Sequence, residues 1–332
     1  MSKVQNISRE ALGDIITNTA AQMKVSETIV EKDYWVCFIL DYLFNTCYFR
    51  DKLVFKGGTS LSKCFGVIHR FSEDIDLILD WNTLGYDIAE PWQERSNTKQ
   101  DKFNKEVNYK TEIFLQEQFL PILTSDLSNL IDDEFHLSID EDDKQTILFH
   151  YPKVFASPYL SEAVRLEIGS LAAWTPSKQM SIKSYISEHY PQLNAGNNIT
   201  INTVAAERTF WEKATILHHE ANRPSDLPMP SRYARHYYDM YMMSISEYKE
   251  KAFSAIDLLE KVVGFKAKFY PRKWAQYENA TVDKIKLLPA SYRYAELEKD
   301  YNNMREMFFG EPPSFTDIMA QIAELEFEIH TI

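Results

Sequence analysis

The spacing of hydrophobic positions separates the chain into a mixed first part and a helical second part. Apolar residues at helical spacing over 8–46 predict two helices, with Ser26 at the start of the second. From about Val204 onward the pattern is almost wholly helical. Short alternating or apolar segments predict strands at 53–55, 74–79, 134–139, 145–151 and 163–170. The predicted fold class is α+β, with a small mixed sheet flanked by helices and a mainly helical C-terminal half.

The segments between these strands complete the predicted layout. The Gly-Gly-Thr-Ser segment after the first strand predicts a turn that leads into a helix over 61–69. A polar stretch at 81–101 predicts a loop or insertion before a helix over 102–119. Because no repeat, low-complexity tract or long linker interrupts the chain, we place the domain boundary where the pattern changes. We expect an α/β core over 1–203 and a helical domain over 204–332.

Composition and cysteine content indicate a globular protein. With 332 residues, of which 45% are hydrophobic, the chain can bury a substantial core. No stretch approaches the roughly 18 uninterrupted apolar residues of a membrane span, and the N-terminus has no apolar signal segment. The three cysteines are too few and too irregularly spaced for a disulfide framework or a zinc site, so we expect buried free thiols. These features predict a cytoplasmic protein that does not contact a membrane.

The net charge of −13 limits how the protein can bind nucleic acid. It argues against a whole surface that neutralises phosphates, so any RNA partner must contact a local basic patch. Candidate cations lie in two stretches: Arg208, Lys213, Arg223, Arg232 and Arg235 in the first, and Lys266, Lys268, Arg272 and Lys273, interleaved with Phe269, Tyr270 and Trp274, in the second. A solvated helix face beside core aromatic residues is the alternative for the second stretch.

The segment from Lys56 to Ser60 is suited to hold an anion. Gly57 and Gly58 lack side chains, so the backbone can turn sharply and phosphates can approach its amides. The start of the following helix offers unpaired N–H groups, and Thr59 or Ser60 can add a hydroxyl. An ordinary strand-to-helix turn with a Ser or Thr cap is the alternative. The G-x-x-x-x-G-K-[ST] pattern of a Walker P-loop is absent.

Asp74 and Asp76 are candidate metal ligands. The alternation of their strand places both carboxylates on one face, about 7 Å apart, and its apolar residues on the other. Neighbouring like charges raise each other's pKa unless a cation neutralises them, and oxygen ligands suit Mg²⁺. Solvated aspartates at a strand end are the alternative.

Glu167 is the candidate third carboxylate. It lies on the polar face of another alternating strand, with apolar residues on the opposite face. If this strand lies beside Asp74 and Asp76, Glu167 can complete a three-carboxylate site of the kind that holds two metal ions. The sequence does not show this pairing, and a cross-strand ion pair through Arg165 is the alternative.

Two motifs, KGGTSLSK and RFSEDIDL, resemble those of the AbiEii/AbiGii-type nucleotidyltransferase toxins, a branch of the polymerase-β-like nucleotidyltransferase superfamily. The segment at 32–34 is similar to the family's N-terminal helix. Downstream, 207–214 resembles its lysine helix and 235–241 its R-D-x-Y-D-type helix, although a histidine stands where an acidic residue often follows the arginine. The resemblance covers about 27–245 and implies a polymerase-β-like core.

The resemblance also implies roles for the residues of these motifs. Asp74 and Asp76 bind metal, Ser60 and the two glycines hold the triphosphate, Lys213 contacts a nucleotide phosphate and Asp239 completes the site. The predicted catalytic residues are Asp74, Asp76, Glu167, Lys213 and Asp239, and the first three are the predicted metal ligands. The predicted nucleotide-binding residues are Lys56, Gly57, Gly58, Thr59, Ser60, Lys63, Lys213 and Arg235.

Helical spacing is compatible with these roles in the C-terminal half. Lys213 shares a face with apolar residues and should point inward, where an ammonium group needs an anion. Arg232, Arg235 and Asp239 are spaced to share one helical face. The alternatives are a lysine that extends to solvent and an exposed, salt-bridged helix.

The predicted activity is transfer of a nucleoside monophosphate from an NTP to an acceptor hydroxyl, with Mg²⁺ as the cofactor and Mn²⁺ as its substitute. The resemblance implies a tRNA 3′ end or other RNA as acceptor, and a toxin of a toxin–antitoxin or phage-defence system with a cognate antitoxin. Three alternatives stay open: nucleotidylation of a protein, a D-x-D glycosyltransferase, and an inactive module that binds a nucleotide or a partner.

Overall fold

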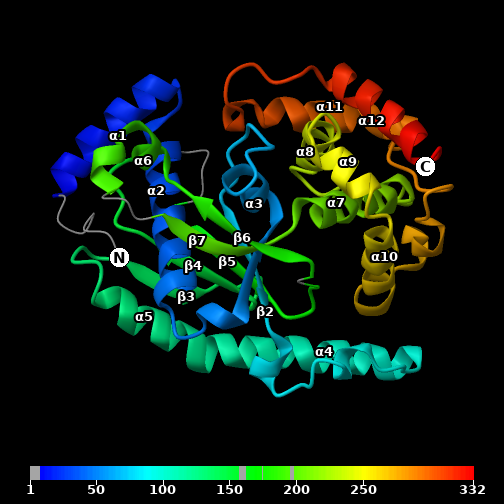
Figure 1. Cartoon of the computed structure of the whole chain (residues 1–332), viewed down its shortest axis with the longest axis horizontal. Coiled ribbons are helices and arrows are strands. Elements are labelled where there is room, and N and C mark those ends of the chain that lie inside the picture. The colour runs from blue at the N-terminus through cyan, green and yellow to red at the C-terminus, as the bar shows by residue number, and fades with distance from the viewer. Residues whose placement is uncertain (1–7, 157–161, 174, 195–197) are drawn as a thin grey trace. The chain divides into compact units, whose positions relative to one another are not determined.

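The computed structural model describes residues 8–156, 162–173, 175–194 and 198–332 (Figure 1). The chain forms two compact units. The sheet unit comprises Met1–Cys64 and Ser72–Thr203, and the helical unit comprises Phe65–Phe71 and Val204–Ile332. Within the described residues, no helix is both long enough and apolar enough to span a membrane. The three cysteines are buried and free, which confirms that prediction.

A seven-stranded mixed sheet forms the centre of the sheet unit. Its strand order is β3-β4-β5-β2-β1-β7-β6. The strands are β1 (Leu53–Lys56), β2 (Asp74–Leu79), β3 (His136–Ile139), β4 (Thr146–His150), β5 (Val164–Gly169), β6 (Ser177–Ile182) and β7 (Ile199–Val204). The five predicted strands and the α+β class are confirmed. The sequence prediction missed β6 and β7, and β6 is polar with only its last residue buried, so it lacks the apolar signal of a strand.

The helices of the sheet unit confirm part of the prediction. They are α1 (Arg9–Met23), α2 (Glu27–Asp41), α3 (Gly57–Lys63), α4 (Asn97–Phe114), α5 (Leu120–Ser128) and α6 (Tyr185–His189). The two helices predicted over 8–46 are present, with Ser26 as the N-cap residue of α2. The helix predicted over 102–119 begins five residues earlier and is followed directly by a π-helical turn and α5.

A helix follows β1 as predicted, but its predicted bounds and the separate turn before it were wrong. The Gly-Gly-Thr-Ser segment is the first turn of α3 itself, and the helix ends at Lys63 instead of continuing to 69. Gly66 has a φ of +62°, which is incompatible with a continuing right-handed helix. The residues after it belong to the helical unit, and their partners lie far along the sequence, so a local pattern could not reveal their conformation.

Consecutive charged residues of α2 are buried and hold other segments of the sheet unit. Lys32, whose side chain is 1% exposed, forms an ion pair with Glu73 at 2.7 Å, directly before β2. Asp33 forms an ion pair with Lys63 at the end of α3 and accepts a hydrogen bond of 2.7 Å from the first backbone amide of α6. Glu31 accepts two backbone hydrogen bonds, at 2.5 and 3.1 Å, from the segment after β4. One turn of α2 therefore positions α3, α6 and the start of β2.

The helical unit contains six helices and one distant segment of chain. The helices are α7 (Ala206–Ala221), α8 (Ala234–Ser244), α9 (Tyr248–Phe253), α10 (Asp257–Phe269), α11 (Tyr294–Asn303) and α12 (Phe315–Ile329). This confirms the helical pattern predicted after Val204. The Phe71 amide donates to the Met307 carbonyl at 2.6 Å, and the Phe309 amide donates to the His69 carbonyl at 2.9 Å. These bonds fasten Phe65–Phe71 to the segment after α11.

Removing Lys32 should destabilise the sheet unit strongly. Lys32→Met leaves the buried Glu73 carboxylate without this ammonium, which should cost about 3–5 kcal/mol of unfolding free energy. Adding Glu73→Gln removes the carboxylate charge and should recover part of the loss. Urea unfolding followed by circular dichroism measures both effects. Lys52→Met is the control, because Lys52 is exposed in its pair with half-buried Asp80 and its loss should cost less than about 1 kcal/mol. Equal losses for Lys32→Met and Lys52→Met would contradict the assignment.

Candidate active site

Strand register places the predicted carboxylates side by side. β2 runs parallel to β5, with Asp76 opposite Glu167 and Asp74 opposite Arg165. β1 runs antiparallel to β2 on its other side, with Lys56 opposite Asp76. Paired residues on adjacent strands share a face of the sheet. Lys56, Asp76 and Glu167 therefore form one row across three strands, here named the Asp76 row, and the two acidic strands are neighbours, which the sequence had left open.

The face of the sheet that carries Asp74, Asp76 and Glu167 has more negative charge than Arg165 alone neutralises. Burial, and then the nearby carboxylates of Asp76 and Asp74, raise the pKa of Glu167, while Arg165 acts in the opposite direction. Arg165 lies with Nε 3.4 Å from Glu167 Oε1 and Nη1 2.6 Å from Asp140 Oδ2. The ion pair through Arg165 that was the alternative is thus present. It joins Arg165 to Glu167 on the same strand, β5, and it does not prevent Glu167 from lying beside Asp76.

Gly57 is the residue that lets α3 begin directly against Asp76. Its φ is +84°, a conformation that strains other residues. A Cβ atom at this position would lie 2.6 Å from Cγ of Asp76 and even closer to Oδ2. Glycine is therefore required both by the backbone and by the space that the carboxylate occupies.

The hydroxyl groups of α3 form hydrogen bonds within the sheet unit. Thr59 Oγ1 donates to the backbone oxygen of Asp74 at 2.6 Å, and it lies 3.0 Å from Ser72 Oγ. Ser60 Oγ donates to the Gly57 carbonyl at 2.8 Å. Thr59 therefore joins α3 to the first residue of β2. The predicted contacts of Thr59 and Ser60 with triphosphate stay predictions.

The ammonium group of Lys63 already has three partners. It forms the ion pair with Asp33, donates to the Lys183 carbonyl at 3.2 Å and lies 3.7 Å from the ring centroid of Tyr185. Its predicted contact with a nucleotide stays a prediction, as does that of Gly58, which lies in the first turn of α3. Whether or not it also contacts a nucleotide, Lys63 holds α3 against α2.

The residues of the carboxylate face fit a divalent cation. Asp74, Asp76 and Glu167 supply only oxygen donors, which Mg²⁺ prefers, and Mg²⁺ normally takes further ligands from phosphates and water. Burial, and then the charges of Asp76 and Asp74, raise the pKa of Glu167, and a bound cation would offset these charges. Across the described ranges, no group of three or more His, Cys, Asp or Glu side chains is already arranged as a metal site. Coordination by all three carboxylates therefore stays a prediction.

A second group of predicted residues lies in the helical unit around Asp239. This carboxylate is fully buried, and Arg70 contacts it through Nε at 2.7 Å and Nη2 at 2.8 Å. Lys213 Nζ lies 2.5 Å from Asp239 Oδ2. Burial acts to raise the pKa of Asp239, but Arg70 and Lys213 together lower it well below its ordinary value. Lys213 therefore points inward towards an anion, as predicted, and it does not extend to solvent.

Arg70 was missed from the sequence, although it stands at the start of the motif RFSEDIDL. Its partner Asp239 is 169 residues away, so no local spacing connects them. The predicted shared helical face was wrong for Arg232, which is exposed, has a φ of +59° and precedes α8. Arg235 lies in the first turn of α8 and is half-buried, and its contact with a nucleotide stays a prediction.

The adjacent histidines of α7, His218 and His219, form contacts within the helical unit. His218 Nε2 lies 3.0 Å from the Gln276 carbonyl, and its Nδ1 accepts a hydrogen bond of 3.0 Å from the Lys286 amide. Both nitrogen atoms of this buried ring are therefore satisfied. His219 packs on the ring of Trp274, with 4.3 Å between the ring centroids.

A comparison with protein families agrees with the resemblance. A model of the family described as "Nucleotidyl transferase AbiEii toxin, Type IV TA system" matches residues 39–321. Among solved structures, the chain is similar to MenT4, a nucleotidyltransferase toxin from Mycobacterium tuberculosis H37Rv. That match has a TM-score of 0.45 and 16% sequence identity, and it covers 93% of this chain and 98% of the other. No curated protein matches the chain.

Gly57→Ala should displace the Asp76 carboxylate. Gly66→Ala is the matched control, because Gly66 also has a positive φ but no atom lies within 4 Å of its added Cβ. We expect Gly66→Ala to cost about 1 kcal/mol through backbone strain alone. Gly57→Ala should cost roughly 1–3 kcal/mol more, because overpacking is added to the strain. Thermal and urea unfolding of the two variants check the difference, and equal losses would show that the contact with Asp76 has no energetic weight.

Proposed function

Because the chain belongs to the AbiEii family of nucleotidyltransferase toxins of type IV toxin–antitoxin systems, we propose that it transfers a nucleoside monophosphate from an NTP to an acceptor hydroxyl. The acceptor oxygen forms a bond to the α-phosphorus, the bond from that phosphorus to the bridging oxygen breaks, and pyrophosphate leaves. The hydroxyl proton is lost in the same reaction. The main observation in support of this proposal is the Asp76 row. Asp74 lies next to it, and Gly57 lies directly against Asp76.

The sheet unit supplies the groups that hold the triphosphate. Asp74, Asp76 and Glu167 would hold Mg²⁺ or Mn²⁺, which when bound favours departure of pyrophosphate by neutralising its developing charge. Lys56 lies in the same row and adds a cation beside the carboxylates. Gly57 gives phosphate access to the backbone of α3, and Thr59 keeps that helix aligned with β2. Positioning and charge neutralisation are the main requirements of phosphoryl-type transfer.

The helical unit supplies further candidate phosphate contacts. Lys213 is a proposed nucleotide contact, and burial lowers its pKa while Asp239 acts to raise it. The ammonium group of Lys213 is already desolvated, so contact with a phosphate would not require this group to be buried further. Asp239 completes the arrangement by orienting Lys213 and Arg70 together. Arg235 is the remaining proposed nucleotide contact in this unit.

RNA is the proposed acceptor, specifically a tRNA 3′ end, and a cognate antitoxin is the proposed partner. The toxin–antitoxin family supports the partner. A protein acceptor would use the same site with a different hydroxyl, so the acceptor is decided by identifying which macromolecule becomes modified.

Transfer can be tested with the purified protein, Mg²⁺, each α-labelled NTP in turn, and total cellular RNA and protein. We expect label on RNA, reduced by about 10³-fold or more in Asp74→Ala/Asp76→Ala, because a metal contributes several kcal/mol to the transition state. That double variant should keep its fold by circular dichroism, since it removes like charges. Asp51→Ala is the control, because Asp51 is exposed.

Each other outcome of this assay has a definite meaning. Label on protein and not on RNA would replace the proposed acceptor. Undiminished label in the double variant would exclude these aspartates from catalysis. No label with any NTP would favour a module that binds a nucleotide or a partner without transfer.

A further inference from the structure

One stretch of the helical unit is strongly basic although the chain as a whole is acidic. Between Glu260 and Glu278 there are five lysine and arginine residues and no acidic residue. The five are Lys261, Lys266, Lys268, Arg272 and Lys273. In a chain of net charge −13, such a stretch creates a local positive potential.

The same stretch gathers aromatic rings and cations around Trp274. The guanidinium groups of Arg223 and Arg272 lie 5.0 and 5.9 Å from the centroid of the Trp274 ring. The ring of His219 packs against Trp274 at a tilt of 30°. His219 lies in the last turn of α7 and Arg223 just after this helix, whereas Arg272 and Trp274 follow α10. Two segments that are far apart in sequence thus form one basic and aromatic surface.

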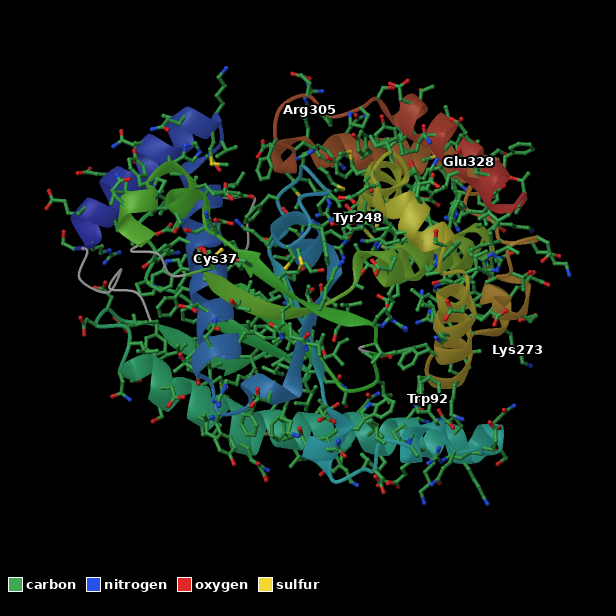
Figure 2. All side chains as sticks on the ribbon, in the orientation of Figure 1. Cys37, Trp92, Tyr248, Lys273, Arg305 and Glu328 are labelled. Atoms are coloured by element: carbon green, nitrogen blue, oxygen red, sulfur yellow. The ribbon has the colours of Figure 1, made fainter. Side chains whose placement is uncertain are left out.

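Two cations of this surface are exposed, whereas the side chain of Arg223 is 11% exposed and Lys266 is half-buried. Arg272 and Lys273 are exposed, and Figure 2 labels Lys273 on this stretch. Arg223 contacts Glu220 at 2.6 Å, whereas Lys266 donates to the backbone carbonyl of Glu212 at 3.1 Å. Tyr270, which lies between Lys268 and Arg272 in the sequence, is 49% exposed.

The pKa of His219 is lowered by burial and by the same positive charges. Burial, and then the charges of Arg272, Lys266 and Arg223, lower its pKa to about 4. The imidazole is therefore neutral at pH 7, and it packs under Trp274 as an uncharged aromatic ring. Any ligand that approaches this surface meets cations together with exposed ring edges or faces.

This chemistry matches single-stranded nucleic acid. Lysine and arginine neutralise backbone phosphates, and aromatic rings stack with unpaired bases. A duplex offers phosphates but no unpaired base to stack. An acidic peptide offers neither phosphates nor bases.

We propose that the surface formed by Arg223, Lys266, Tyr270, Arg272, Lys273 and Trp274, here named the Trp274 surface, binds single-stranded RNA. This inference rests on the proposed function, because it assigns to the RNA acceptor a binding surface on the helical unit. It concerns binding alone and involves no residue to which a catalytic role is assigned.

Fluorescence anisotropy with a labelled 20-nucleotide RNA that lacks secondary structure tests the electrostatic part. The full chain is used without NTP or divalent metal. We expect Arg272→Ala/Lys273→Ala to raise the Kd about tenfold and to reduce the salt slope by about 1.4, for two lost phosphate contacts. Lys102→Ala/Lys105→Ala on α4 removes the same charge from exposed positions and should change the Kd less than twofold. Equal effects of the two double variants, or no binding by the unmodified chain, would overturn the proposal.

The aromatic part is tested by Tyr270→Leu and Trp274→Leu with the same RNA and with its duplex. Loss of stacking should raise the Kd for the single strand about tenfold and leave the duplex within twofold. Tyr270→Leu is the variant more certain to fold, because Tyr270 is half exposed. Equal weakening of both RNAs, or no change with either RNA, would overturn the stacking contact.

These results can be separated from the transfer reaction. If RNA binds to the Trp274 surface but is not labelled in the transfer assay, the proposed acceptor fails while the binding surface stands. If RNA is labelled equally well by the unmodified chain and by Arg272→Ala/Lys273→Ala, and both bind RNA equally, the Trp274 surface fails while the proposed function stands.

Discussion

The register that joins β1, β2 and β5 is the constraint on which the sheet-unit site depends. It aligns Lys56, Asp76 and Glu167, and it places Asp74 beside Arg165. A shift of one residue would turn every side chain of a strand to the opposite face, so the apolar face that fixes the register also fixes the carboxylates. Burial, and then the charges of Asp76 and Asp74, raise the pKa of Glu167 on this face. Burial of the apolar side of these strands stabilises the sheet and offsets the repulsion among the carboxylates.

Buried ion pairs keep the neighbouring segments in place. Lys32 holds the residue before β2, and Asp33 holds the end of α3, so α2 forms an ion pair with one residue of each motif. In the helical unit, Asp239 has the same role towards Arg70 and Lys213. Such pairs are sensitive to the loss of one partner, because the remaining charge stays buried. They are therefore better suited to fixing a geometry than to adding stability.

Part of this arrangement could be predicted from the sequence, because period-two alternation reveals which strand residues share a face. Asp74, Asp76 and Glu167 were identified in this way, and resemblance to a family added Lys213 and Asp239. The partners Asp33 of Lys63 and Arg70 of Asp239 were not predicted, because they are 30 residues or more away in the chain and no repeat marks them. The start of α3 at Gly57 was also missed, because two glycines normally indicate a turn. Here the first of them is required by the carboxylate that lies against it.

Binding of Mn²⁺ tests the central claim, that Asp74, Asp76 and Glu167 together hold a divalent cation. Electron paramagnetic resonance can count the bound Mn²⁺ in the presence of a non-hydrolysable NTP analogue, for the unmodified chain and for Asp76→Asn and Glu167→Gln. The account predicts that each substitution weakens Mn²⁺ binding by at least about tenfold, since each removes a charged oxygen ligand. Unchanged Mn²⁺ affinity in both variants would contradict it.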